Sequence, residues 1–355
     1  MAKTYRVGLN LGTLCNLQCK YCYEHGMEPT EVSEKYLLRY ASYLQYLVST
    51  FPEGTTLAIG IFGGEPLLHL DKLEKFIRQT SSFIKKYIIT INGTLVDDCK
   101  EGLLRLKQYN DSGEARIDIH VSYDFTLQDS MRCAGTYESV RDAIRWLYAQ
   151  GLCTRVTPVF TFETMPHFKE VFLDYVELQK ELPKLRMVFN IDKYAYEVPL
   201  GFNESAVREQ LAFVRDYIET HPELQEVVKY NRACCTRRWE PADNKAFFRN
   251  LVGAMVEDGT MYPAWSMPYY HEKGRELLRF GHITDDFADI VAAKDALIAK
   301  LPKMSVPDAC AACALNCHLT PFQNITESLD QWNQQPAVKG TCYLTRLINE
   351  YIPLD

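Results

Sequence analysis

The chain has 355 residues, of which 47% are hydrophobic and 24% charged, with a formal net charge of −7. These are globular values without a disorder signature, and the length favours one large domain plus a smaller one. The acidic balance gives no support to nonspecific binding to nucleic acid or anionic membranes, which requires basic patches. No apolar run predicts a membrane span or a secretory signal, so the 12 cysteines indicate metal or redox chemistry in a reducing, cytoplasmic compartment.

Six β-branched runs alternate with amphipathic stretches over the first 195 residues or so. The predicted strands are 5–12, 57–64, 86–93, 116–124, 153–161 and 186–193, and the predicted helices include 33–50, 70–85, 137–150 and 168–182. The third helix has Thr136 as a plausible N-cap and Gly151 just after its end. Crossover helices join parallel neighbours, so the alternation predicts a parallel sheet. Periodicity alone leaves an open doubly wound sheet and a partial barrel as alternatives.

The alternation fades after about residue 195. Residues 203–229 read as one long polar bridging helix, Glu257-Asp258-Gly259-Thr260 as a hairpin turn, and 289–301 as a further helix. We therefore expect two domains, 1–230 and 231–355.

Cys15, Cys19 and Cys22 follow the first predicted strand, at the sheet edge where active sites of parallel α/β proteins gather. Three thiolates bind three irons of a [4Fe–4S] cluster and leave the fourth iron open to a small chelating molecule. The alternative is a zinc site with a fourth ligand such as His25. Spacing alone does not separate the two.

This spacing, with Tyr21 before the third cysteine, resembles the signature of the radical S-adenosylmethionine (SAM) superfamily. Three later segments are similar to further motifs of that family: Gly63-Gly64-Glu65-Pro66, Thr90-Ile91-Asn92-Gly93-Thr94, and Ser122-Tyr123-Asp124 followed by Arg132. The resemblance implies an α/β fold with a partial (β/α)6 TIM-like barrel and a smaller C-terminal iron–sulfur domain. It also implies that the cofactor-binding residues are Tyr21, Gly63, Gly64, Glu65, Asn92, Ser122 and Arg132.

The resemblance assigns roles to several of these residues. The glycines would let the backbone approach the cofactor, and Glu65 would accept from the ammonium group of SAM. Ser122 and Arg132 would hold its carboxylate or ribose, since the fork of an arginine binds carboxylates in bidentate fashion. The implied reaction reduces SAM through the cluster, with flavodoxin or ferredoxin as electron donor, and yields a 5′-deoxyadenosyl radical that abstracts hydrogen from a substrate.

A second cysteine group offers four further thiolates: Cys310, Cys313, Cys317 and Cys342. In isolation these spacings favour structural zinc. Residues 257–263, however, resemble the hairpin of the SPASM and twitch auxiliary-cluster domains, which implies one auxiliary [4Fe–4S] cluster here. The inner auxiliary site of that family would need a cysteine where Ala264 stands.

The sequence leaves three alternatives open for Cys234 and Cys235: core residues, ligands or active-site thiols. As an active-site thiol, Cys235 would donate a hydrogen atom to a substrate radical. SPASM-type enzymes mostly act on peptides, so a peptide or protein is the leading substrate. The alternative is a small molecule, amino acid derivative or nucleotide base, for which Trp265, Tyr269 and Tyr270 would stack a flat substrate. From another class, a zinc-stabilised binding protein without catalysis also fits the cysteines.

Overall fold

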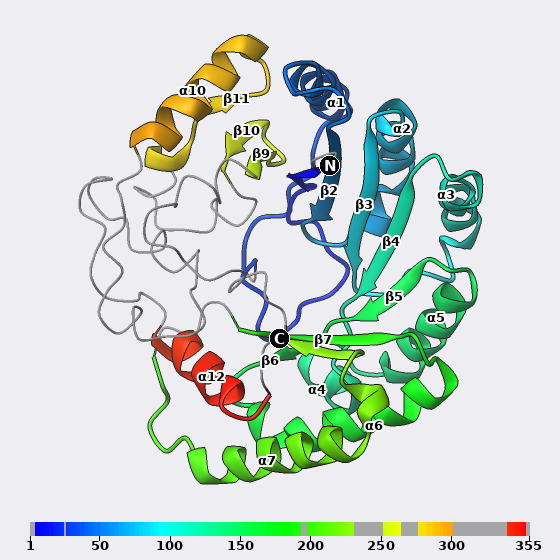
Figure 1. Ribbon diagram of the computed structural model, residues 1–355, viewed down its shortest axis with the longest axis vertical. Coiled ribbons are helices and arrows are strands. Elements are labelled where there is room, and N and C mark those ends of the chain that lie inside the picture. Colours follow the sequence, from blue (N-terminus) through cyan, green and yellow to red (C-terminus); the bar gives the residue numbers. More distant parts are fainter. Residues whose placement is uncertain are drawn as a thin grey trace.

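The computed structural model describes residues 4–24, 26–192, 197–230, 251–263, 276–300 and 339–352. Figure 1 shows the strands as an inner arc with the helices outside it. Within the described part, no helix is long and apolar enough to cross a membrane.

Six parallel strands form the centre of the sheet, in the order β1-β2-β3-β4-β5-β7. Their bounds are Thr4–Asn10, Thr56–Phe62, Ile84–Ile91, Arg116–Val121, Cys153–Val156 and Arg186–Ile191. Strand β6 (Val159–Phe160) also pairs with β7. The predicted strand 153–161 is thus two short strands, interrupted at Pro158, which has no N–H to give to a ladder. The six strands and the partial-barrel arrangement are as expected.

The outer helices are α1 (Glu34–Ser49), α2 (Leu70–Thr80), α3 (Lys100–Ser112), α5 (Tyr137–Ala149) and α6 (Phe168–Glu181). Short helical segments lie in the connections between strands and these helices: η1 (Pro66–His69), η2 (Phe125–Leu127), α4 (Gln128–Met131) and η3 (Met165–His167). They cover one face of the sheet. Tyr87 of β3, for example, meets Thr80 of α2, with 2.7 Å between the two hydroxyl oxygens. Alternate strand residues point to opposite faces, so Lys86 and Ile88 lie on the other, concave face.

The start of α5 differs from its expected cap. Thr136 occupies the N-cap position, but its side chain caps no helix amide. Instead Oδ1 of Asp129 accepts from the backbone N–H of Thr136 at 2.9 Å and of Tyr137 at 2.8 Å. At the other end Gly151 has φ +72°, as predicted for a residue that follows a helix.

The predicted bridging helix is wrong in its second half. Helix α7 (Glu204–Thr220) ends before His221-Pro222, because a residue that precedes proline is pushed out of the helical region. The chain then forms η4 (Pro222–Leu224) and strand β8 (Val228–Tyr230), which pairs in parallel with β7.

The hairpin predicted around Glu257–Thr260 is confirmed. Strands β9 (Leu251–Met255) and β10 (Thr260–Tyr262) pair antiparallel, and β11 (Gly281–His282) follows. Strand β9 also pairs in parallel with β1, so the sheet continues across the predicted boundary at 230/231. The helix predicted at 289–301 is α10 (Phe287–Lys300). Helix α12 (Lys339–Asn349) contacts α7 where Tyr343 donates a hydrogen bond to Glu204.

Candidate active site

The three N-terminal cysteines lie in one loop, which leaves β1 at the carboxyl edge of the parallel sheet. Each thiol is partly exposed. Burial raises the pKa of all three, and in Cys22 to about 11, where Glu24 and the other two thiols add to the effect. The thiolate forms are therefore unfavourable unless a cation binds them.

The donors around these sulfurs suit an iron–sulfur cluster. The backbone N–H of Leu17 donates to Sγ of Cys15 at 3.4 Å, and Nδ2 of Asn92 lies 3.9 Å from the same sulfur. Nη1 of Arg132 lies 3.9 Å from Sγ of Cys19. Outer groups that hydrogen-bond to ligand sulfurs tune such clusters. Among the described residues, no three Cys, His, Asp or Glu side chains are grouped to hold a single metal ion.

Gly63 and Gly64, between β2 and η1, are required by the approach of the cysteine loop. A Cβ at Gly63 would lie 2.1 Å from Oδ1 of Asn10, and one at Gly64 would lie 1.9 Å from the carbonyl oxygen of Leu14. The backbone N–H of Gly64 also donates to Oε2 of Glu24 at 3.1 Å. The two glycines therefore hold the second loop against the first, a requirement that comes before any contact with a cofactor.

Glu65 is fully buried and joins three loops at this edge. Its Oε2 accepts from the backbone N–H of Asn92 at 2.7 Å, and its Oε1 from that of Leu67 at 2.9 Å. Its own N–H donates to the carbonyl oxygen of Leu14 at 2.9 Å. The structure thus assigns both carboxylate oxygens to main-chain amides, and the expected contact with an ammonium group stays a prediction.

Burial raises the pKa of Glu65 from 4.5 to about 7, although the two amides pull it down. The folded protein binds this proton more tightly than the unfolded chain, so the contribution of Glu65 to stability is present at low pH and is lost as pH rises towards 7. Between pH 5 and pH 8 we expect the free energy of unfolding to fall by about 2–3 kcal/mol more in the wild type than in Glu65→Gln. Urea unfolding of both proteins across this range measures the difference, and parallel pH profiles would contradict it.

Asn92, just after β3, connects that strand to the cysteine loop. Its Nδ2 donates to Oδ1 of Asn16 at 2.9 Å, and its Oδ1 accepts from the N–H of Thr94 at 2.9 Å. Nδ2 of Asn16 in turn donates to the hydroxyl of Thr94 at 2.9 Å. Asn16 and Thr94 thus share the network with Asn92, and no pattern in the sequence predicts that their amide and hydroxyl groups meet.

Asp124, which follows β4, organises the other side of the loop. Its Oδ2 accepts from Nε of Arg132 at 2.7 Å and from the hydroxyl of Tyr21, and its Oδ1 accepts from the N–H of Val159 at 2.9 Å. The guanidinium carbon of Arg132 lies 5.3 Å from the ring centre of Tyr21. Both charged side chains are almost fully buried. Burial alone would lower the pKa of Arg132, but Asp124 outweighs it and the pKa is raised.

Asp124 was not among the predicted site residues, although it belongs to the segment that carried the resemblance. Phe125, which follows it, has φ +54° and is fully buried. A non-glycine residue in that region is strained by about 1–3 kcal/mol and persists where its surroundings hold it. Ser122 lies at the same edge, partly exposed, and its N–H donates to the carbonyl oxygen of Ile91 at 2.8 Å.

Replacing Arg132 by glutamine is expected to lower the free energy of unfolding by about 3–5 kcal/mol, because it leaves Asp124 charged and buried. Arg78→Gln removes the same charge from an exposed position on α2 and is expected to change stability by less than about 0.5 kcal/mol. Urea unfolding compares the two. Equal effects would show that the Arg132–Asp124 ion pair does not organise this side of the loop.

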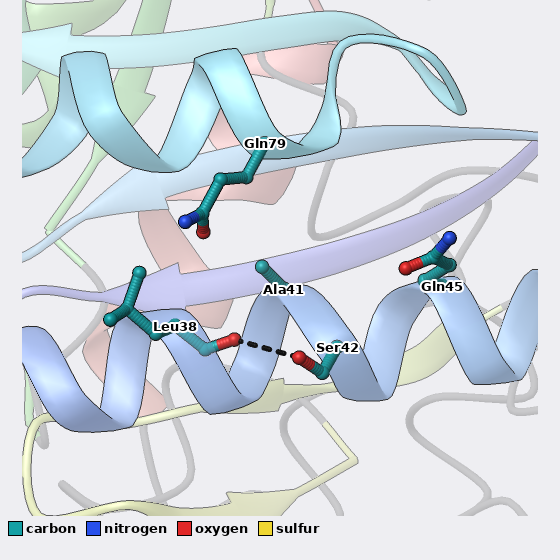
Figure 2. A pocket seen from close by; sticks show the side chains of 5 residues that line it. All are labelled: Leu38, Ala41, Ser42, Gln45 and Gln79. Carbon is teal, nitrogen blue, oxygen red and sulfur yellow. Dashed lines mark hydrogen bonds between the residues drawn. The ribbon is translucent and has the colours of Figure 1, made fainter.

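The predicted residues at the carboxyl edge come together, since Tyr21, Gly63, Glu65, Asn92 and Ser122 each follow a parallel strand. The predicted cysteines beyond the N-terminal loop are not placed: Cys235, Cys310, Cys313 and Cys317 lie outside the described residues, and only the backbone of Cys342 is described, within α12. Figure 2 shows a pocket of about 300 Å³ between α1 and α2, on the outer layer. It is lined by uncharged side chains, so it offers no acid–base or metal chemistry.

Residues 9–174 match the family model described as the Radical SAM superfamily. Over 163 residues the chain is 26% identical to the AdoMet-dependent heme synthase of Oleidesulfovibrio alaskensis, covering 44% of this chain and 39% of the relative. Over 226 residues it is 25% identical to a probable GTP 3′,8-cyclase of Halobacterium salinarum, covering 60% and 58%. The chain thus spans well under two thirds of these curated relatives.

Two solved structures share the fold over most of the chain. One is anSMEcpe with bound AdoMet and the Kp18Cys peptide, with a TM-score of 0.68, 17% identity, and coverage of 98% of this chain and 96% of that one. The other is SuiB of Streptococcus suis bound to the precursor peptide SuiA, with a TM-score of 0.65, 14% identity, and coverage of 96% and 76%. At such identities the likeness shows the fold alone.

Proposed function

We propose that residues 9–174, which match the Radical SAM family model, form a radical SAM domain in which Cys15, Cys19 and Cys22 hold a [4Fe–4S] cluster with one open iron. The observation that carries the proposal is the shared loop of three thiols, two of which already have N–H donors directed to sulfur. When bound at the open iron, SAM would supply a 5′-deoxyadenosyl radical for hydrogen abstraction.

The chain's own residues fix the geometry of this loop. Gly63 and Gly64 allow the loop after β2 to lie against the cysteine loop, and the carboxylate of Glu65 accepts a hydrogen bond from the backbone N–H of Asn92. Asp124 orients Arg132 towards Cys19. Such outer groups matter because a cluster ligand that shifts alters both the affinity for metal and the reduction potential. Tyr21, Ser122 and Arg132 remain our candidates for contacts with SAM.

Elemental analysis and electron paramagnetic resonance test the cluster. Protein purified without oxygen should contain iron and sulfide, about four of each for this cluster and about eight if Cys310, Cys313, Cys317 and Cys342 hold an auxiliary one. The spectrum of the reduced protein should change when SAM binds the open iron. Zinc without iron would instead support the binding protein that lacks catalysis.

A peptide or protein is the first substrate class that we propose. It is supported by the fold shared with two proteins that were solved with peptides bound. We further propose that residues 231–355 form a SPASM- or twitch-like domain, that flavodoxin or ferredoxin donates the electrons, and that Cys235 quenches a substrate radical. An unchanged product from Cys235→Ala would remove the last of these roles.

A small anionic molecule is the second candidate, and a specific observation favours it. The concave face of the sheet carries the basic side chains Arg6, Lys86, Arg155 and Arg186. The curated relatives are named for a heme synthase and a GTP cyclase. Nucleoside triphosphates that stimulate the formation of 5′-deoxyadenosine, where unrelated peptides do not, would decide for this class.

A further inference from the structure

Six polar residues lie together on the concave face of the sheet, below the cysteine loop. The strand register places Lys86 on β3 in one row with Arg6 on β1, through Ala58. His120 on β4 pairs with Arg155 on β5, which pairs with Arg186 on β7. We call this set the lumen cluster; its members are Arg6, Lys86, Asp118, His120, Arg155 and Arg186.

Asp118 is the only carboxylate in the lumen cluster, and its partners already surround it. Its side chain is 6% exposed. Lys86 lies 3.3 Å from it, His120 lies 3.5 Å from it, and the hydroxyl of Thr154 donates to it at 3.1 Å. Burial lowers the pKa of His120, which is therefore neutral at pH 7. The charges of Lys86 and Asp118 offset each other, so the three arginines carry the net positive charge of the lumen cluster.

The three arginines are close enough to repel one another, and two of them, Arg6 and Arg186, are exposed. Arg155 is half-buried, and burial lowers its pKa, with Arg186 and Arg6 adding to the effect and Asp118 opposing it. Among the described residues, none of the three guanidinium groups has a hydrogen-bond acceptor or an ion-pair partner. A ligand that binds all three guanidinium groups would need several oxygens and more than one negative charge.

The height of the cluster in the sheet limits what would occupy it. Arg6 stands four residues before Asn10, the last residue of β1, so it lies about 13 Å below the carboxyl edge at about 3.3 Å per residue, whereas Arg155 stands one residue before Val156, the last residue of β5. A substrate that reacts at this edge and also contacts Arg6 must therefore be extended. A single carboxylate satisfies one fork, whereas a diphosphate or triphosphate has oxygens for three.

We propose that the lumen cluster binds the polyphosphate group of a small-molecule substrate through Arg6, Arg155 and Arg186, with its reacting end at the cysteine loop. This rests on the proposed function for the chemistry at the edge, but the binding itself does not require it. Lys86, held by Asp118, adds positive charge at the side of the site.

Calorimetric titration of the cluster-loaded protein with inorganic pyrophosphate, at low and at moderate salt, tests the site. We expect one pyrophosphate per chain, with affinity that decreases as salt rises. Arg155→Gln and Arg186→Gln should each weaken binding about 10- to 100-fold. The matched control Arg78→Gln, outside the cluster on α2, should stay within about twofold of the wild type.

Asp118→Asn distinguishes loss of binding from misfolding. It should bind pyrophosphate more tightly, because it removes the negative charge that opposes the anion. A poorly folded protein would not bind more tightly. Absence of pyrophosphate binding, or equal loss in Arg78→Gln, would overturn the site. If the wild type cleaves SAM but does not bind pyrophosphate, the binding site is wrong and the proposed function stands. If it binds pyrophosphate but forms no 5′-deoxyadenosine, the proposed function is wrong and the binding site stands.

Discussion

Cys19→Ser is expected to lose the N-terminal cluster, with a fall of about four irons per chain. Changes in outer groups cost about 10- to 100-fold in metal affinity, and loss of a direct ligand should cost more. Formation of 5′-deoxyadenosine should fall below about one hundredth of the wild-type rate as a result. Iron content and product quantification measure the two effects.

Cys133→Ser is the matched control, because Cys133 is exposed and lies outside the cysteine loop. It should keep its iron and its rate. If Cys19→Ser retained full iron while Cys133→Ser lost it, the ligand set would be wrong. Cys15→Ser and Cys22→Ser should behave as Cys19→Ser does, since three thiolates serve one cluster.

Gly64→Ala is expected to destabilise the fold by about 2–5 kcal/mol. Left-handed backbone costs a side chain about 1–2 kcal/mol, and overpacking costs about 1–3 kcal/mol more. Gly64 has φ +43°, and its Cβ would lie 1.9 Å from the carbonyl oxygen of Leu14, a backbone atom that moves only with the cysteine loop. We therefore also expect the variant to bind less iron.

Gly151→Ala separates the cost of the left-handed backbone from the cost of overpacking. Gly151 has φ +72°, but a Cβ there meets nothing within 4 Å, so only the conformational cost of about 1–2 kcal/mol applies. Urea unfolding and iron content of both variants provide the comparison. Equal destabilisation with unchanged iron would show that the contact between the two loops does not support the site.

The sequence was sufficient to predict the strands and most of the helices, because the alternation of apolar runs follows from burial on the helix-covered face. The first four predicted strands end at 12, 64, 93 and 124, two or three residues beyond the observed ends at Asn10, Phe62, Ile91 and Val121. The end of α7 at His221-Pro222 was readable from the proline and was missed. Strand β8 was missed with it, since three residues carry too little periodicity.

The contacts within the site were not predictable in the same way. The link from Glu65 to the amide of Asn92 joins residues 27 positions apart, and that from Tyr21 to Asp124 joins residues 103 apart. The resemblance implies a role towards a cofactor for Tyr21, Glu65 and Asn92, whereas the structure shows that they bind other protein groups. The lumen cluster depends on strand register, which residue types alone do not fix.

Quantification of 5′-deoxyadenosine shows whether Cys15, Cys19 and Cys22 hold a cluster that cleaves SAM. The reconstituted protein, incubated with dithionite and SAM without oxygen, should form 5′-deoxyadenosine and methionine, and Cys19→Ser should form neither. Iron-loaded wild type that yields no 5′-deoxyadenosine under these conditions would contradict the account.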